Sequence, residues 1–259
     1  MGKNSVLEVP RALRRGGRLE EVERSVSDST KIYQLVCKRL GLTDLNGVSV
    51  LDMGCGWRMS KAILDNDLPV AHYAGIDVFA ESIEFLSSNV SDERFSYYLL
   101  DSHNEMYNPG GKPLADFTEL PVHEASFDLV WLFSVFTHLA PHDYAVMLKL
   151  LRPYVKPQGK LVFSVFLNEE TAGGHGFIDN VNRAFSKALA KSRDVQDKFA
   201  ENYTAGVPEF VDFDPENPLK WAIYRRDYAM ELIEGTGWTV DAVYDPEDVI
   251  QHYIVCSPC

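Results

Sequence analysis

The chain has 259 residues, of which 46% are hydrophobic and 24% are charged, and its formal net charge is -13 at pH 7. These values are typical of a globular protein with one large domain. The negative charge argues against nucleic acid and against an anionic membrane surface as partners, because both would repel the chain. No apolar run approaches the roughly 20 residues of a membrane span, so we expect no membrane insertion.

The N-terminus has no apolar signal-peptide core, and only four cysteines occur in the chain. Sparse cysteines in a chain without a leader indicate reduced thiols, so we expect a cytoplasmic protein. Residues 1–46 are expected to form a basic N-terminal arm followed by a helix over residues 19–40. That helix is indicated by Ile32, Leu35, Val36 and Leu40, which share one helical face.

Strands and helices alternate from residue 47 to residue 168, which predicts right-handed crossovers and a parallel sheet. The expected strands end near Asp52, Asp77, Leu100, Phe133 and Phe166. The expected helices cover residues 61–67, a segment that follows Asp77, and residues 142–151. Pro153, Pro157 and Gly159 are expected to turn the chain into the fifth strand, over residues 160–166.

The alternation stops at Asn168. Residues from about 168 to 224 are too long for an ordinary connection, and they are interpreted as a lid-like insertion in a domain over residues 47–259. A helix over residues 228–235 and strands over 240–244 and 250–256 follow. A short link joins these strands, so they must pair antiparallel. The expected fold is α/β, a Rossmann-like, seven-stranded, mostly parallel sheet with helices on both faces and a C-terminal antiparallel hairpin.

The most informative stretch runs from Val48 to Arg58 and reads V-S-V-L-D-M-G-C-G-W-R. It predicts a buried strand that breaks into a tight loop before a helix. Gly54 and Gly56 lack a Cβ, so the backbone there can turn sharply and approach a ligand. Asp52 at the strand end is typical of a small-molecule cofactor site at the carboxyl edge of an α/β sheet.

Three acidic residues, Asp52, Asp77 and Asp101, follow three successive strands and so meet at one edge of the sheet. Asp77 lies about 20 residues beyond the glycine turn, where a carboxylate is needed to accept hydrogen bonds from a ribose diol. NAD and S-adenosylmethionine fit this pattern equally well. Met59 stands where a dinucleotide fingerprint needs a third small residue, and the final hairpin is foreign to a plain dinucleotide fold. A cofactor without a pyrophosphate is therefore favoured.

The chain resembles the class I S-adenosylmethionine-dependent methyltransferases. L-D-M-G-C-G is similar to their first motif, Y-A-G-I-D-V to their second, and F-D-L-V-W-L-F-S-V-F-T-H-L to their fourth strand. The segments H-N-E-M-Y-N-P-G-G and S-V-F-T-H-L resemble a bacterial subgroup associated with modification of glycans and glycoconjugates. Arg58 departs from the family's first motif, in which a third glycine is common.

This resemblance implies cofactor contacts at nine positions. Asp52, Gly54 and Gly56 would hold the methionine moiety, and Asp77 the ribose hydroxyls. The remaining contacts would come from Asp101 and Ser102 beside the adenine, Phe79 on its face, and Phe133 and Ser134 at the methionine. For Phe79, a place in the core is an equally good interpretation.

Methyl transfer from a sulfonium to a hydroxyl needs alignment, desolvation and a general base. His138, just past the fourth strand, is one candidate base, and the alternative is a structural histidine. His175, at the start of the insertion, is a second candidate. No metal site is expected, because the spacing of the histidines and Asp101 is not specific for one.

The sequence therefore favours methyl transfer from S-adenosylmethionine to a small-molecule acceptor, with a hydroxyl of a sugar or glycoconjugate preferred. Three alternatives remain: N- or C-methylation of a natural product, a nucleotide-dependent oxidoreductase, and a non-catalytic binding protein. No recognisable motif encodes the acceptor atom or the oligomeric state.

Overall fold

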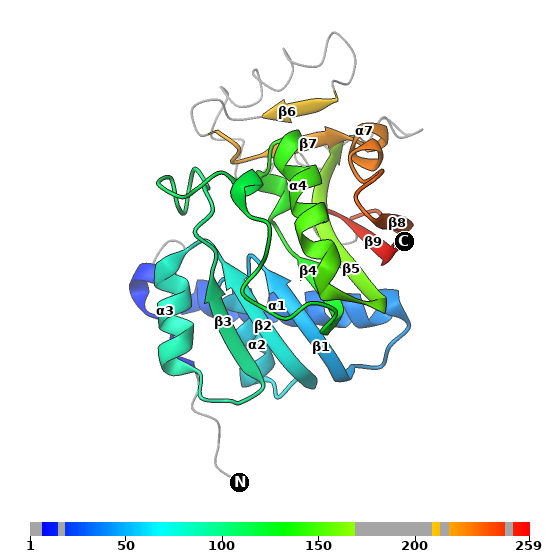
Figure 1. The fold of residues 1–259 in the computed structure, drawn as a ribbon. Coiled ribbons are helices and arrows are strands. Elements are labelled where there is room, and N and C mark those ends of the chain that lie inside the picture. The colour runs from blue at the N-terminus through cyan, green and yellow to red at the C-terminus, as the bar shows by residue number, and fades with distance from the viewer. Residues whose placement is uncertain (1–6, 15–18, 169–208, 213–217, 247–250) are drawn as a thin grey trace. The chain divides into compact units, whose positions relative to one another are not determined.

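The computed structural model describes residues 7–14, 19–168, 209–212, 218–246 and 251–259 (Figure 1). The chain divides into two compact units. The first contains residues 1–133 and 153–162, and the second contains residues 134–152 and 163–259. One long strand, β5 (Val155–Asn168), starts in the first unit and ends in the second.

The first unit is a parallel sheet with helices. Its elements in chain order are α1 (Leu19–Leu40), β1 (Leu45–Met53), α2 (Arg58–Asp65), β2 (Val70–Asp77), α3 (Ala80–Asn89), β3 (Phe95–Leu99) and β4 (Phe127–Leu132). The strand order is β3-β2-β1-β4-β5, so β1 is flanked on both sides. β1 pairs parallel with β2 and with β4, and β2 pairs parallel with β3. The last four residues of β1 are buried, as expected for a central strand covered on both faces.

Helix α1 packs against α2, and one tyrosine secures the chain that leaves α1. The hydroxyl of Tyr33 donates to the carbonyl oxygen of Pro69 at 2.7 Å and accepts from the backbone N–H of Leu45 at 2.9 Å. Tyr33 therefore joins α1 to the starts of both β1 and β2. The expected helix over residues 19–40 is confirmed with the same bounds.

The second unit contains α4 (Pro141–Leu151), the end of β5, and five later elements. These are β6 (Phe210–Asp212), β7 (Ala222–Arg225), α7 (Arg226–Glu231), β8 (Trp238–Tyr244) and β9 (His252–Pro258). β7 runs parallel to the end of β5, and β6 runs antiparallel to β7. β8 and β9 form the expected antiparallel pair, and β9 also pairs with β5.

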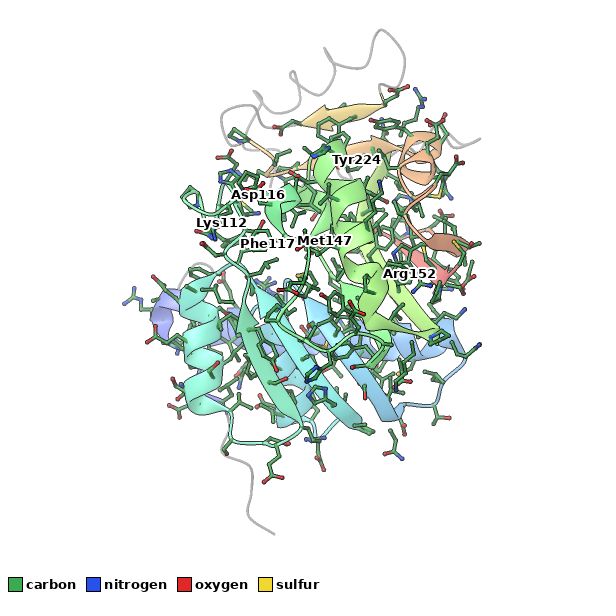
Figure 2. All side chains as sticks on the ribbon, in the orientation of Figure 1. Lys112, Asp116, Phe117, Met147, Arg152 and Tyr224 are labelled. Carbon is green, nitrogen blue, oxygen red and sulfur yellow. The ribbon has the colours of Figure 1, made fainter. Side chains whose placement is uncertain are left out.

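Aromatic rings fill the core of the second unit. The ring of Tyr144 lies 4.4 Å from that of Phe136 and 5.1 Å from that of Tyr224, measured between centroids. The hydroxyl of Tyr224, labelled in Figure 2, donates to the carbonyl oxygen of Leu139. Arg152, labelled in the same view, donates through Nε to the carbonyl oxygen of Gly237 at 2.8 Å and so links the end of α4 to the start of β8.

The mostly parallel α/β fold with a C-terminal antiparallel pair is confirmed, and three local expectations change. β5 begins at Val155, so Pro157 and Gly159 lie inside the strand and not before it. A Cβ at Gly159 would lie 2.9 Å from the carbonyl oxygen of Asp128, which explains the glycine in this strand. Two short strands, β6 and β7, were not predicted. The rest of the expected insertion, residues 169–208 and 213–217, lies outside the described residues.

Gly75 in β2 generates a prediction about packing. A Cβ at this position would lie 2.8 Å from Sγ of Cys55 and 2.9 Å from Cδ1 of Tyr97. Because overpacking a buried site costs about 1–3 kcal/mol, Gly75→Ala should lower the free energy of unfolding by that amount in urea titrations. Cys55→Ala in the same chain removes one of the two clashes and should restore part of the loss.

Gly110→Ala is the matched control, because a Cβ there meets no heavy atom within 4 Å. Its free energy of unfolding should change by less than about 0.5 kcal/mol. A Gly75→Ala variant as stable as the Gly110→Ala variant would contradict the close packing of β2 against the glycine turn.

Candidate functional site

The glycine turn between β1 and α2 is held against the end of β2. Gly54 and Gly56 both have positive φ angles, +77° and +45°, which residues with a side chain adopt only with strain. The backbone N–H groups of Gly54 and Cys55 both donate to the carbonyl oxygen of Ile76, at 2.7 and 3.1 Å. The turn therefore follows the carboxyl end of β2 closely.

The carboxylate of Asp77 also holds the glycine turn against the end of β2. Its Oδ2 accepts from the backbone N–H of Gly56 at 2.7 Å, and its Oδ1 accepts from the backbone N–H of Phe79 at 2.9 Å. Burial raises the pKa of Asp77 above its ordinary value, while the hydrogen bonds from the backbone oppose that rise. One side chain thus joins the glycine turn to the segment that starts α3.

Asp52 lies beneath the turn and is only 3% exposed. Its Oδ2 accepts a hydrogen bond from the hydroxyl of Tyr73, which lies on β2. Burial raises the pKa of the Asp52 carboxyl to about 7, and the hydrogen bond from Tyr73 opposes the rise. Because Tyr73 occupies one oxygen of this buried group, direct contact between Asp52 and a methionine ammonium stays a prediction.

Asp101 and Ser102 begin a polar loop that closes on itself. The exposed Asp101 accepts from Nδ2 of Asn108 at 3.1 Å through its Oδ1, and its carbonyl oxygen accepts from the backbone N–H of Lys112 at 2.9 Å. Ser102 is buried. A Cβ at Gly111 would lie 2.5 Å from the carbonyl carbon of Ser102, so only glycine lets the two ends of the loop approach this closely.

Two aromatic residues of the predicted site have aromatic partners. The ring of Phe79 lies 5.7 Å from that of Tyr107, in a tilted arrangement, and Tyr107 is 38% exposed. Phe133 lies 5.6 Å from the buried Trp131. Phe79 is half-buried, and its pair with the exposed Tyr107 next to Asp77 offers a face on which a flat base can stack.

The remaining predicted residues lie in the second unit or outside the described residues. Ser134 has a positive φ of +60°, and its backbone N–H donates to Oγ of Ser164 at 2.8 Å. Nδ1 of His138 lies 3.1 Å from the carbonyl oxygen of Leu219. A carbonyl oxygen only accepts, so Nδ1 carries the proton and Nε2 of the neutral ring is unprotonated. His175 lies outside the described residues.

Sequence reasoning missed two residues that hold the site together, Tyr73 and Asn108. Tyr73 was assigned only to a strand, although its side chain bonds Asp52 on the neighbouring parallel strand. In the register of β1 and β2, Tyr73 lies opposite Val50, two residues before Asp52 and therefore on the same face. That register was the available signal. Asn108 carried none, because its bond to Asp101 closes an irregular loop.

Within the described residues, no group of three or more histidine, cysteine or acidic side chains is placed to hold a metal ion. Within the same residues, no helix is both long enough and apolar enough to cross a membrane.

The residues that form this geometry lie in a part of the chain that is similar to a known family. Residues 51–163 match a family model described as a methyltransferase domain. The match runs from Leu51 near the end of β1 to Phe163 within β5, and it includes the glycine turn, Asp77 and Asp101.

Solved structures agree in fold. A protein from Pyrococcus horikoshii is 16% identical with a TM-score of 0.54, and the alignment covers 90% of each chain. An S-adenosylmethionine-dependent methyltransferase from Mesorhizobium loti is 13% identical with a TM-score of 0.53, over 85% of this chain and 94% of that one. The mitomycin 7-O-methyltransferase is 13% identical with a TM-score of 0.56, over 91% of this chain and 54% of that one. At these identities the likeness shows the fold.

The residues present suit S-adenosylmethionine. The two oxygens of Asp77 have about four lone-pair sites, and two backbone N–H groups use two of them, so the carboxylate can still accept from hydroxyls. Open space lies where a Cβ at Gly56 would project. Residues 51–163 thus match a methyltransferase domain, and the solved structures share its fold.

The buried Asp52 gives a prediction about pH. Its pKa is about 7 in the folded protein, against an ordinary value of 3.8, so the folded state holds this proton more tightly than the unfolded state. The contribution of Asp52 to stability is therefore greatest below pH 4 and falls as pH rises to about 7. We compare the unfolding free energies of Asp52→Asn and wild type in urea at pH 4.5 and at pH 8. Between these pH values, the difference should shift by a few kcal/mol in favour of Asp52→Asn.

Tyr73→Phe removes the hydrogen bond that lowers the pKa of Asp52. In this variant the loss of stability should extend to higher pH than in wild type. An equal pH dependence in wild type, Asp52→Asn and Tyr73→Phe would show that Asp52 does not titrate as proposed.

Proposed function

We propose that this protein transfers a methyl group from S-adenosylmethionine to a hydroxyl of a small molecule, with a sugar or glycoconjugate as the acceptor class. The observation that carries the donor half is the Asp77 carboxylate. It is buried, it is held by two backbone N–H groups, and it stands between the glycine turn and the aromatic pair of Phe79 and Tyr107. A ribose diol bound there would lie between the methionine and adenine ends of the cofactor.

The oxygen acceptor is supported by separate observations. The motif segments H-N-E-M-Y-N-P-G-G and S-V-F-T-H-L resemble a glycan-modifying subgroup. One structural neighbour is an O-methyltransferase acting on mitomycin, and its likeness to this chain concerns the fold. Nδ1 of His138 faces a carbonyl oxygen, so in the neutral ring Nε2 is the basic nitrogen, as a general base requires.

These residues would have different roles in the reaction. When bound, S-adenosylmethionine supplies an electrophilic methyl group on a sulfonium. Asp77, Gly54 and Gly56 would fix the donor, and Asp101, Ser102 and Phe79 would hold its base, so that the methyl group is aligned for in-line attack. Nε2 of His138 would take the proton from the acceptor hydroxyl as the new bond forms, and backbone at Phe133 and Ser134 would contact the methionine. His175 remains a second candidate for the base.

Asp77 gives the first test. Asp77→Asn keeps the size of the side chain but removes its charge and one of its two acceptors, so S-adenosylhomocysteine should bind about ten-fold or more weakly in calorimetry. The control is Glu84→Gln, an exposed acid-to-amide change on α3. If the Asp77→Asn and Glu84→Gln variants bind as tightly as wild type, the ribose assignment is wrong.

His138 gives the second test. A panel of saccharides and other hydroxylated compounds, incubated with methyl-labelled S-adenosylmethionine, identifies the best acceptor. On that acceptor, His138→Gln should lower kcat about 100-fold, the usual scale for loss of a general base, and leave S-adenosylhomocysteine affinity unchanged.

His142→Gln, a histidine change at an exposed position in the first turn of α4, is the control for His138→Gln. It should keep full turnover. A His138→Gln variant with normal kcat would remove this residue from the mechanism, and one with a lowered unfolding midpoint would point to a structural role.

A further inference from the structure

His138 is held by a carbonyl oxygen that belongs to a strained residue. Nδ1 of His138 lies 3.1 Å from the carbonyl oxygen of Leu219, and Leu219 has a φ of +55°. A residue with a side chain adopts this left-handed backbone only at a cost, and it persists only where the surroundings fix it. The contacts that hold Leu219 therefore decide where the acceptor for the histidine ring lies.

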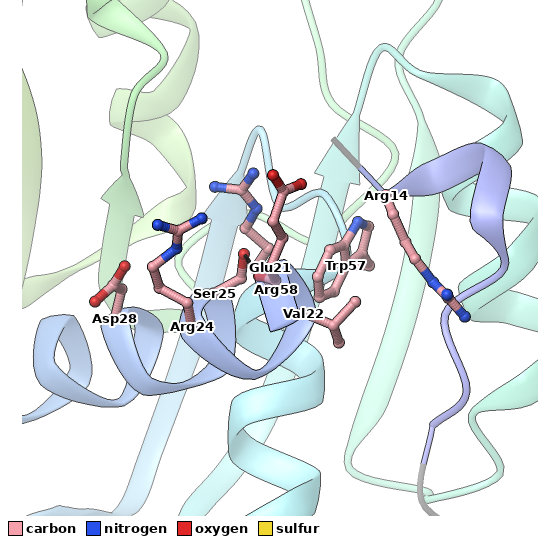
Figure 3. Close-up of a pocket in the computed structure, with 8 residues that line it drawn as sticks. All are labelled: Arg14, Glu21, Val22, Arg24, Ser25, Asp28, Trp57 and Arg58. Atoms are coloured by element: carbon pink, nitrogen blue, oxygen red, sulfur yellow. Dashed lines mark hydrogen bonds between the residues drawn. The ribbon is translucent and has the colours of Figure 1, made fainter. Parts of the chain in front are cut away.

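Trp57, drawn in Figure 3, shows that a carbonyl acceptor can hold a ring without such strain. The indole Nε1 of Trp57 donates to the carbonyl oxygen of Leu13 at 2.9 Å. Leu13 lies in a short 3-10 helix, Arg11–Leu13, and is not among the described residues with a positive φ. The strained backbone of Leu219 therefore needs a cause other than the presence of a ring beside its carbonyl oxygen.

A carboxylate on β6 holds the other side of Leu219. Oδ2 of Asp212 accepts from the backbone N–H of Leu219 at 3.0 Å. Asp212 lies opposite Ala222 in the antiparallel pair of β6 and β7, so this bond ties Leu219 to β6 just before β7 begins. Leu219 is thus bonded on both sides, through its N–H to Asp212 and through its carbonyl oxygen to His138.

Two further contacts within the second unit fix the chain around Leu219. The ring of Trp221, two residues later, stacks on the ring of Phe166 in β5, with 5.4 Å between centroids. In β7, the hydroxyl of Tyr224 donates to the carbonyl oxygen of Leu139, the residue that follows the histidine. Because both β7 and the segment that carries the histidine are held, the conformation of Leu219 decides whether its carbonyl oxygen meets the ring.

The second oxygen of Asp212 makes this residue unusual. Oδ1 is buried, and within the described part of the chain no donor reaches it. A buried acceptor without a donor destabilises the folded state. An acid that lowers stability in this way is more consistent with a role in positioning the segment that its other oxygen holds than with a role in stability.

We propose that Asp212 is a positioning residue for His138. By accepting from the N–H of Leu219, it fixes the carbonyl oxygen that takes the Nδ1 proton. The hydrogen bond at one nitrogen of a neutral imidazole decides which nitrogen carries the proton, so Asp212 keeps Nε2 as the basic nitrogen. The effect on turnover rests on the base role proposed above for His138, and the effect on the tautomer does not.

Histidine NMR tests the proposal independently of turnover. The protein is labelled with 15N-histidine and measured where the ring is neutral, and the His138 signals are assigned by their loss in His138→Gln. Wild type should show Nδ1 protonated and Nε2 unprotonated, and so should Asp212→Asn, whose amide oxygen can still accept from Leu219. Asp212→Ala should show a mixture of the two tautomers.

Asp212→Val is a second variant, because valine suits a strand and buries no polar atom. It should give the same mixture of tautomers as Asp212→Ala. If Asp212→Ala and Asp212→Val keep the tautomer of wild type, or if Asp212→Asn loses it as fully as Asp212→Ala does, the proposal is overturned.

Turnover of the best acceptor gives a second arm. Asp212→Ala should lower kcat about ten-fold, less than loss of the base itself, and should leave KM within about two-fold. Glu234→Ala, an exposed acid-to-alanine change in the same unit, is the control and should leave both values unchanged. In the His138→Gln background, Asp212→Ala should cause no further loss of kcat, because Asp212 acts through His138.

The two arms separate this proposal from the proposed function. If His138→Gln keeps full kcat, the base assignment is wrong, while mixed tautomers in Asp212→Ala still support Asp212 as the positioning residue. If His138→Gln loses turnover and Asp212→Ala lowers kcat equally with and without His138, the base assignment stands and the positioning role of Asp212 is overturned.

Discussion

The arrangement of the glycine turn depends on one buried carboxylate, that of Asp77. It accepts from the backbone N–H of Gly56 and from that of Phe79, and these donors follow two different strands. Without this acceptor, the N–H of a glycine at a φ of +45° would have to find another partner in a crowded turn. The same two bonds lower the pKa of Asp77 and so oppose the rise that burial causes. The atoms that hold the turn are therefore the same atoms that we propose as ribose ligands.

The pairing of β1 with β2 determines which side chains pack beneath the glycine turn. Asp52 lies opposite Gly75 in the parallel register. The missing side chain at Gly75 makes room for Cys55 of the turn, and Tyr73 of the same strand bonds the Asp52 carboxyl. The buried acid destabilises the fold near neutral pH, because its pKa is about 7. A residue with this cost is more consistent with a role in the function of the turn than with a role in stability.

The spacing of apolar residues and the acidic residues at strand ends predicted most of the fold. The α1 helix, the parallel strands, the C-terminal hairpin and the acids at the sheet edge all follow from local pattern. Contacts between side chains distant in sequence do not: the bonds of Asp52 to Tyr73 and of Asp101 to Asn108 depend on register and loop closure. Pro157 suggested a turn, yet it lies inside β5, because a strand tolerates proline where no ladder bond is needed.

The two units differ in how they hold the residues that the sequence singled out. Asp52, Asp77, Asp101 and the glycine turn all lie in the first unit, and they are linked by backbone bonds that tolerate little substitution. His138 lies in the second unit and takes its orientation from a carbonyl oxygen of Leu219, a residue with a strained φ of +55°. A backbone acceptor constrains the ring but not the neighbouring side chains. The side chains around His138 can therefore vary without disturbing the hydrogen bond that orients its ring.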